Sequence, residues 1–490
     1  MLKILLVGIF VAVLLASGLY SMRKTRNLGD FYLGGRDIGP WMSAFAYGTT
    51  YFSAVIFVGY AGKVGWGFGI GGLWIAIGNA LIGSFLAWKI LAKPTRVMTE
   101  KLGAMTMPEL LEGRYDSKAL KIFSSAIIFI FMVPYSASVF MGLSYVFEGV
   151  FNIPYNYILI FMAVITAIYL LMGGYRAIAL TDFIQGIVML FGVGVLLYYV
   201  FGNPAVGGLG QIIPRLKAIS PELVNPLPTG EKGLALFSVV LLTSLGPWGL
   251  PQMVQKFYAI KDKKNIRAAT VISTLFALII GVGAYGVGSV ARLYFSELPV
   301  DPATGVATVD LLVPGIINVA LPELAAVLIL LLILSASMST LSSLVLVSSS
   351  TLSVDLLKGF VKPEMSNKDE LLITRILCFI FVMLSVVLAM VKPTIILSLM
   401  ALSWGTIAGI FLGPYIWGLF WPKTTKAGAW SGIIVGLIIS VLYASLHNFD
   451  GNATTIGGAL AMLSSLVIVP VVSLFTTQYA TEHLEKVYAE

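Results

Sequence analysis

Two apolar segments of this chain are interrupted at their centres by residues that disfavour a continuous helix. The interrupting residues are Gly48, Thr49, Thr50 and Ser53 in segment 40–62, and Ser244, Gly246, Pro247, Gly249 and Pro251 in segment 233–258. A helix interrupted at bilayer depth leaves main-chain groups without intrahelical partners, and hydrocarbon cannot satisfy them. Such breaks persist where they line a site for an ion or a solute, so two of them in one chain predict a secondary transporter.

The composition indicates a polytopic α-helical membrane protein. The chain has 490 residues, of which 58% are hydrophobic and only 11% are charged, a balance that soluble globular proteins do not show. Its net charge of +8 reflects Lys and Arg residues in short loops, so it indicates membrane topology, and no nucleic-acid partner is expected. The single cysteine, Cys378, excludes internal disulfides and a Cys-rich metal site.

Hydropathy along the chain predicts thirteen membrane spans of about 20 residues each. Their approximate limits are 3–22, 40–62, 69–93, 119–147, 154–173, 178–201, 233–258, 266–293, 321–354, 372–391, 394–421, 427–446 and 455–477. The first span is followed by Arg23, Lys24 and Arg26. A basic cluster after the apolar run favours a retained span with its N-terminus outside over a cleaved signal peptide.

The distribution of basic residues agrees with that orientation. With the N-terminus outside, all but seven of the 31 Lys and Arg residues lie on the inner side. The seven outer residues are Lys3, Lys63, Arg215, Lys217, Lys232, Arg292 and Lys392. We therefore expect a multi-pass protein of the plasma (cytoplasmic) membrane, surrounded by the lipid bilayer, with a cytoplasmic C-terminus.

The interrupted segments are spans 2 and 7, and an odd offset means that they cross the membrane in opposite directions. We therefore predict a single transporter domain over 1–490, built from two inverted repeats of five helices. The first repeat covers 40–201 and the second covers 233–421. Residues 1–39 supply a peripheral first helix with its loop, and 427–477 supply two peripheral helices.

One span is unusually rich in hydroxyl groups. Residues 334–350 hold nine Ser and Thr side chains in seventeen positions. Ser339 and Thr340 follow Ala336 by three and four residues, so their hydroxyls are expected near its carbonyl. Together with carbonyls freed around Thr49–Phe52, these oxygens suit a hard cation such as Na⁺. Hydroxyls that bond back to the preceding turn of the helix would explain the same composition.

Asp182 is the most informative single residue, because an acid at this depth is costly and usually has a partner. The candidate partners are Na⁺, Arg176 and a lysine of a neighbouring loop. Ser342 and Ser343 continue the hydroxyl face by one turn toward the same side of the membrane. Asp182, Ser342 and Ser343 are therefore a candidate second cation site, and an interfacial pair of Asp182 and Arg176 is the alternative.

For the solute, the candidates are the aromatic residues near the breaks, namely Tyr51, Tyr135 and Trp248, although simple packing is the ordinary explanation for any one of them. Lys256, near the inner end of its span, is expected to mark the interface. The lack of basic residues placed to clamp a large polyanion favours a small solute. The sequence contains no GxSxG, HExxH or Walker motif, so no enzyme activity is expected. Nothing in it indicates an obligatory protein partner.

Several stretches of the chain, in this order, resemble the sodium:solute symporter family. They are the LGGRDIGP run within Phe31–Pro40, GGYRA and TDFIQ within Gly173–Gln185, MSTLS at Met338–Ser342, and Phe420–Ala429. The family includes proline, pantothenate, monocarboxylate, sialic acid and sugar transporters. The resemblance covers essentially the whole chain and implies a leucine-transporter-type fold and Na⁺-coupled symport by alternating access.

The resemblance also implies which residues bind the ions and the solute. The shared Na⁺ site of the family corresponds here to Thr49, Phe52, Ala336, Ser339 and Thr340. The second Na⁺ site of some members corresponds to Asp182, Ser342 and Ser343. The positions near the solute correspond to Thr50, Tyr51, Ser53, Tyr135, Trp248 and Pro251.

The chain departs from the family's proline transporters at three positions. Tyr51 stands where they have an aspartate, and Thr243 and Pro247 stand where they have Trp and Tyr. We therefore expect Na⁺-coupled uptake of a small organic solute, a carboxylate or an amino acid, without naming it. The alternatives are a proton-coupled symporter with Asp182 as the proton carrier, and a solute sensor. A sensor would need a signalling domain, for which the tail after residue 477 is too short.

Overall fold

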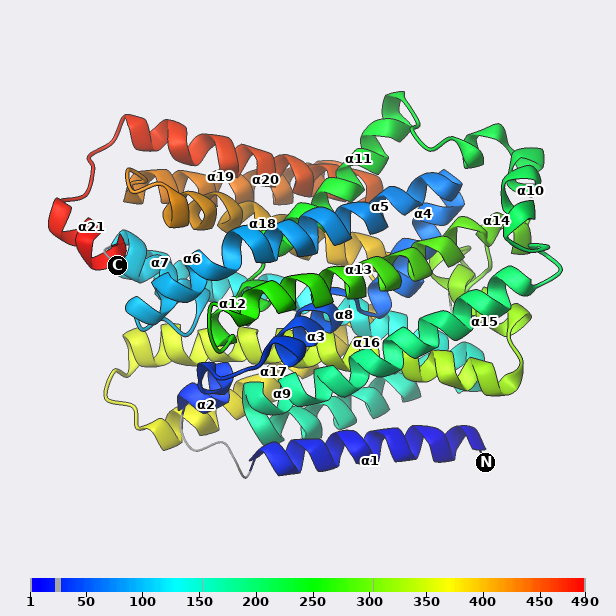
Figure 1. The fold of residues 1–490 in the computed structure, drawn as a ribbon, viewed down its shortest axis with the longest axis horizontal. Helices are drawn as coiled ribbons and strands as arrows, with labels where there is room; N and C mark the ends of the chain where they lie inside the picture. Colours follow the sequence, from blue (N-terminus) through cyan, green and yellow to red (C-terminus); the bar gives the residue numbers. More distant parts are fainter. Residues whose placement is uncertain (1, 23–27, 152, 303, 489–490) are drawn as a thin grey trace.

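The structure of the chain is a computed structural model that describes residues 2–22, 28–151, 153–302 and 304–488. Its long helices run along the longest axis of the molecule, and α1 begins at the opposite end of that axis from α21 (Figure 1). The α-helices are α1 Leu2–Met22, α2 Leu28–Leu33, α3 Pro40–Tyr51, α4 Ala61–Phe68, α5 Leu73–Gly78, α6 Ala87–Lys101, α7 Met107–Tyr115, α8 Lys118–Phe151, α9 Tyr155–Gly202, α10 Ile212–Ile219, α11 Gly230–Leu245, α12 Pro251–Ala259, α13 Asn265–Ser289, α14 Ala291–Tyr294, α15 Leu312–Ala320, α16 Glu323–Ser350, α17 Asn367–Val391, α18 Ile396–Phe420, α19 Lys426–Leu446, α20 Gly451–Leu474 and α21 Thr481–Tyr488.

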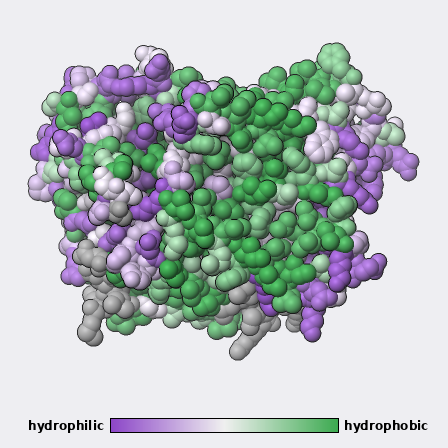
Figure 2. Space-filling view, turned by 180° about the vertical axis from the view of Figure 1, so that it is seen from behind, coloured by the Kyte–Doolittle hydropathy of each residue, from purple (hydrophilic) through white to green (hydrophobic). Residues whose placement is uncertain are grey.

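Within the described residues, ten helical stretches are long and apolar enough to cross a membrane. They are Val55–Lys101, Lys118–Gly149, Gly174–Gly202, Gly230–Ala259, Asn265–Tyr294, Glu323–Val361, Asn367–Val391, Ile396–Phe420, Lys426–Leu446 and Gly451–Leu474. Hydrophobic residues form a broad band across the middle of the surface, and hydrophilic residues gather toward its two ends (Figure 2). This distribution is that of a protein that crosses a bilayer many times.

Three of the thirteen expected spans fall outside that set of ten. Span 3–22 contains the shorter apolar segment Leu5–Ser21, and span 154–173 contains Tyr155–Ile168. The third, 40–62, is divided between α3 and the helical stretch that begins at Val55. Length and apolarity identify ten spans, so the count of thirteen stays a prediction.

The first interruption lies directly after α3. Phe52 has φ −108° and ψ 98°, which is an extended conformation, while its N–H still bonds to the Gly48 carbonyl at 3.1 Å. Helical structure resumes at Val55 as a π-helix that ends at Tyr60. The Ser53 hydroxyl accepts a hydrogen bond from the Val55 N–H at 3.2 Å, which satisfies one main-chain donor where the helix resumes.

The second interruption lies between α11 and α12. A 3₁₀ turn over Gly246–Trp248 follows α11, and Leu250 is extended with φ −87° and ψ 120°. Pro247 cannot donate a main-chain hydrogen bond, which weakens the helix at this point. Pro251 opens α12, where the missing N–H costs nothing because the first turn of a helix has no acceptor for it.

Helix α9 contains two expected spans that meet at Gly174. This glycine has φ 59° and ψ −161°, a conformation that residues with a Cβ avoid. A Cβ atom there would lie 2.6 Å from the main-chain oxygen of Phe31 in α2. A kink at Gly174 therefore separates the expected spans 154–173 and 178–201.

The hydroxyl-rich helix α16 lies at the centre of the bundle. Of its most apolar membrane-spanning stretch, 89% is buried within the protein, compared with 33% for α17 and 33% for α19. It packs against α3, α8 and α9. Its Ser and Thr residues are therefore surrounded by protein and lie beside the first interruption.

Candidate functional site

Helix α16 meets the broken end of α3 through hydroxyl and carbonyl groups. The Ser339 hydroxyl donates to the main-chain oxygen of Thr49 at 3.0 Å, and the Thr340 hydroxyl lies 3.3 Å from the same oxygen. Thr340 also donates to the Thr50 oxygen at 3.2 Å. The Ala336 carbonyl lies 3.1 Å from the Ser339 hydroxyl and 3.0 Å from that of Thr340. Four of the five residues expected at the first sodium site therefore lie together.

The fifth residue, Phe52, lies at the break itself, where the main chain leaves the helix. Its ring stacks on that of Tyr51, with 4.5 Å between the ring centroids. The donor set around Ser339 and Thr340 consists of buried oxygen atoms. Such a set suits a hard monovalent cation and gives no nitrogen or sulfur ligand for a softer metal.

The second polar cluster is the candidate set of Asp182, Ser342 and Ser343, and its two serines adjoin this group. Ser343 shares a hydrogen bond with the Thr50 hydroxyl at 2.9 Å, and Ser342 donates to the Ser339 carbonyl at 2.9 Å. Asp182 is wholly buried, and neither of its carboxylate oxygens has a hydrogen-bond partner among the described residues. The alternative pair with Arg176 is therefore not formed within the part of the chain that the structure describes.

Lys256 belongs to this cluster, and the expectation that it marks the interface is wrong. Its side chain is wholly buried, and its ammonium donates to the Ser343 hydroxyl at 2.9 Å. The position could have been found from the break, because Lys256 follows Pro251 by only five residues. Five residues span about 7.5 Å of helix, so a lysine there remains within the bilayer when the break lies at mid-depth.

A small internal cavity lies between the two interruptions. It is small, with a volume of about 10 Å³. Its lining residues come from the first break and the helical turn after it, from the π-helical stretch Asn79–Leu86, and from α11, α13 and α18. They are Tyr51, Ser53, Ile56, Tyr60, Asn79, Thr243, Tyr285, Met400 and Trp404. Tyr135 adjoins it through an edge contact with the Trp404 ring, at 5.7 Å between centroids.

Several buried hydrogen-bond donors on and beside this cavity have no partner among the described residues. They are the hydroxyls of Tyr60, Tyr135 and Tyr285, the side-chain amide nitrogen of Asn79 and the indole nitrogen of Trp404. A buried donor without an acceptor costs free energy. A ligand that brings acceptor oxygens into this cavity would remove that cost.

The other expected solute residues lie elsewhere. The Trp248 indole N–H donates to the Ile82 carbonyl at 2.9 Å, and Thr50 faces Ser343. Pro251 lines a separate small cavity with Gln255 and residues of α16. Of the sequence candidates, Tyr51, Ser53 and Tyr135 are thus the ones that the fold brings to the internal cavity.

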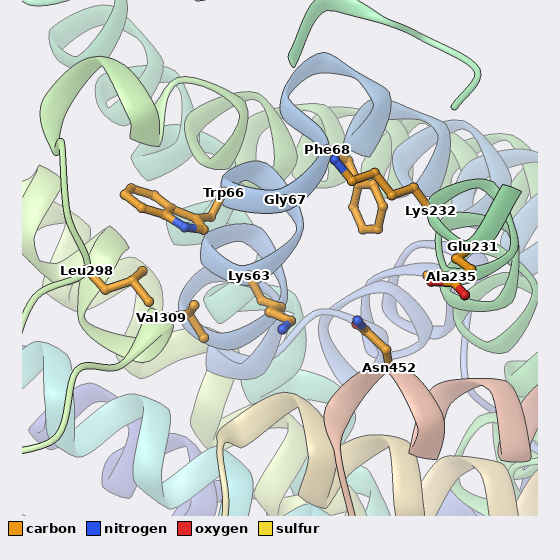
Figure 3. A pocket seen from close by; sticks show the side chains of 10 residues that line it. All are labelled: Lys63, Trp66, Gly67, Phe68, Glu231, Lys232, Ala235, Leu298, Val309 and Asn452. Atoms are coloured by element: carbon orange, nitrogen blue, oxygen red, sulfur yellow. The ribbon is translucent and has the colours of Figure 1, made fainter. Parts of the chain in front are cut away.

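A larger pocket of about 330 Å³ opens near one end of the molecule. Residues of α4 project along one side of it, with the start of α11 facing them (Figure 3). Its lining residues are Lys63, Trp66, Gly67, Phe68, Glu231, Lys232, Ala235, Leu298, Val309 and Asn452. Lys63 and Lys232 are among the basic residues expected on the outer side, so this pocket corresponds to the expected outer end.

Comparison with known proteins agrees with the sequence resemblance. The model of the sodium:solute symporter family matches residues 31–436. The chain belongs to the sodium:solute symporter family. Its family members are transporters and not enzymes, and membership implies sodium ions and a small-molecule substrate.

Similar proteins, one of them with a solved structure, align with nearly the whole chain. It is 29% identical to the high-affinity proline transporter PutP of Bacillus subtilis, over 96% of this chain and 98% of that protein. It is 30% identical to the sodium/proline symporter of Escherichia coli, over 89% of this chain and 86% of that protein. A Na⁺-coupled sialic acid symporter in a substrate-bound outward-open state matches with a TM-score of 0.79 and 18% identity, over 98% of this chain and 99% of that chain. The symporter shares that fold.

Proposed function

We propose that this symporter couples the entry of Na⁺ to the uptake of a small organic solute, a carboxylate or an amino acid, across the plasma membrane. The observation that carries the solute class is the set of buried donors without partners around the internal cavity. Hydroxyl, amide and indole donors suit carboxylate oxygens. None of the lining residues of this cavity is basic, so a large polyanion is not favoured.

The proposed sodium site consists of Thr49, Phe52, Ala336, Ser339 and Thr340. What supports it is the contact of two hydroxyls of α16 with two carbonyls at the broken end of α3. A sodium ion there would be coordinated by these oxygens, and this coordination would replace the hydrogen bonds between them. Sodium would in this way fix the broken end of α3 against the central helix.

The proposed architecture is a leucine-transporter-type bundle of thirteen spans with two inverted repeats of five helices, an outer N-terminus and a cytoplasmic C-terminus. It is supported by the breaks after α3 and α11 and by the bias of basic residues. The beginning of α1 and α21 lie at opposite ends of the long axis (Figure 1), as an odd number of crossings requires.

Coupling in this proposal is a difference in affinity between two states. Sodium binding orders the breaks, solute binds beside them, and the unit of α3–α6 and α11–α13 rocks against the rest. At about 100 mV and a tenfold Na⁺ gradient, each ion contributes roughly 2.3 + 1.4 kcal/mol, or ~500-fold accumulation.

The test uses the purified protein in proteoliposomes at fixed pH. Uptake of labelled proline, pantothenate, short monocarboxylates and sialic acid is measured with an inward Na⁺ gradient, and with K⁺ or Li⁺ in its place. The expected result is uptake of one of these solutes with the Na⁺ gradient, and no uptake when K⁺ or Li⁺ replaces Na⁺. Uptake that follows a pH gradient without Na⁺ would replace the proposal by proton coupling. Solute binding without any uptake would replace it by sensing.

A further inference from the structure

Lys256 brings a positive charge into the second polar cluster. Its ammonium donates to Ser343 at 2.9 Å and lies 4.9 Å from the centroid of the Tyr175 ring. The side chain of Lys256 has no exposed surface. A buried ammonium is costly unless an opposite charge compensates it. Asp182 is the acid whose charge acts on it.

The two serines of the cluster are already engaged in hydrogen bonds, whereas its carboxylate is not. The Ser343 hydroxyl accepts from Lys256, and the Ser342 hydroxyl donates back to the Ser339 carbonyl of its own helix. The carboxylate of Asp182 is left without a hydrogen-bond partner. Lys256 therefore supplies a contact to Ser343 and a positive charge that acts on Asp182, as a sodium ion at this place would.

Charge balance also separates the two candidate cation sites. The group around Ser339 contains neutral oxygens only, so an ion there brings the first charge. The second polar cluster already holds the ammonium of Lys256, which contacts Ser343 and whose charge acts on Asp182. A sodium ion added there would face a like charge at close range in a medium of low dielectric constant.

We propose that the Lys256 ammonium takes the place of a second sodium ion, so that the symporter carries a single Na⁺ in each cycle. This inference rests on the proposed function and fixes its coupling ratio. Lys256 belongs to α12, which follows the second break. The fixed charge thus ties the second broken helix to α16 at the place where a mobile ion would otherwise do so.

The experiment counts ions with Na⁺ alone, because the solute is unidentified. Binding of ²²Na⁺ to the purified full-length protein is titrated at fixed pH, with choline chloride keeping the ionic strength constant. Wild type is expected to bind one ion with a Hill coefficient of about 1. Lys256→Met removes the charge and keeps the length of the side chain. It is expected to bind a second ion, with a Hill coefficient approaching 2.

Two further variants make the result specific. In the double variant Lys256→Met/Asp182→Asn the count is expected to return to one, because the carboxylate that binds the second ion is gone. Lys261→Met is the matched control, since Lys261 is exposed and pairs with Asp37, and its ion count is expected to equal that of wild type. Lys256→Gln replaces Lys256→Met if the latter does not fold.

Two ions in wild type, or the same ion count in wild type and in the folded Lys256 variants, would overturn the inference. The proposed function fails separately. If wild type binds no sodium and Lys256→Met binds one ion that Asp182→Asn removes, the replacement of an ion by Lys256 stands, whereas the single Na⁺ per cycle and the proposed sodium coupling both fall. If neither protein binds sodium, both fall.

Discussion

The phenol of Tyr51 donates a hydrogen bond to the main-chain oxygen of Thr243, with 2.6 Å between the two atoms. Tyr51 ends α3 and Thr243 lies near the end of α11, so the bond joins the two interrupted helices. The residue four positions after Thr243 is Pro247, which has no N–H to donate to that carbonyl. Tyr51 therefore supplies the partner that the proline removes.

This relationship connects the three positions at which the chain departs from the proline transporters of its family. These three residues form one structural unit. Pro247 leaves the Thr243 carbonyl without its helical donor, and the Tyr51 hydroxyl donates a hydrogen bond to that carbonyl instead. The Tyr51 ring also stacks on Trp404, at 6.0 Å between centroids. An ionised aspartate at position 51 would have no proton to donate to this carbonyl.

Removing the phenol hydroxyl tests the unit. Tyr51→Phe keeps the ring and leaves the Thr243 carbonyl buried without its donor, so it is expected to destabilise the protein by about 1–2 kcal/mol. The measurement is the thermal unfolding temperature of the purified protein. Tyr157→Phe is the control, because Tyr157 is 70% exposed. Equal unfolding temperatures for Tyr51→Phe and wild type would show that the bond contributes nothing to stability.

Removing one hydroxyl from the proposed sodium site should weaken Na⁺ binding. Ser339→Ala or Thr340→Ala loses one oxygen ligand, and we expect the half-saturating Na⁺ concentration to rise roughly tenfold or more. The measurement is the Na⁺-dependent increase in thermal stability, with choline chloride as the replacement salt. Ser337→Ala is the matched control, because its hydroxyl bonds to the Ile333 carbonyl of its own helix at 2.7 Å. Equal Na⁺ dependence in all three variants would rule out this site.

The contact between α16 and the end of α3 could be predicted from the sequence. Helical spacing places the hydroxyls of Ser339 and Thr340 beside the Ala336 carbonyl, and the Gly, Thr and Ser residues of 48–53 mark where carbonyls become free. Both signals are local, so they survive without knowledge of the tertiary structure. The all-helical, membrane-spanning class followed in the same way from composition and the length of the apolar runs, whereas the count of thirteen spans and the inverted repeats stay predictions.

The rest of the candidate site depends on how distant segments pack. Asn79 and Tyr285 line the cavity because their helices cross beside the breaks, and an apolar helix gives no periodic signal for such a contact. Trp248 was expected there, but its indole is bonded to Ile82. Lys256 was misplaced because a basic residue near the end of a predicted span was assigned to the interface.

The close approach of α4 and α13 should tolerate no side chain at Gly65. A Cβ there would lie 1.8 Å from the main-chain oxygen of Gly288. That oxygen belongs to a helix backbone, so it cannot move away by a side-chain rotation. Gly65→Ala is expected to cost at least about 1–3 kcal/mol of stability. The unfolding temperature and the monodisperse fraction in gel filtration measure it. Gly67→Ala, in the same helix and with nothing within 4 Å of the new Cβ, should behave like wild type, and a similar loss there would contradict the argument.

The segments that flank the two broken helices are joined at one end by an ion pair with a predictable pH dependence. The Lys261 ammonium lies 2.9 Å from the Asp37 carboxylate. Beside this ion pair, the Lys261 main-chain N–H donates to the Ile38 carbonyl at 3.0 Å. Lys261 holds the pKa of the Asp37 carboxyl below its ordinary value of 3.8. The folded protein therefore binds that proton more weakly than the unfolded chain, so the stabilisation is present above about pH 4 and is lost as the pH falls through the lowered pKa.

Asp37→Asn should lower the unfolding temperature slightly at pH 7 and low salt, and the difference from wild type should shrink at acidic pH and in high salt. A difference that depends on neither pH nor salt would show that Asp37 acts through something other than its charge.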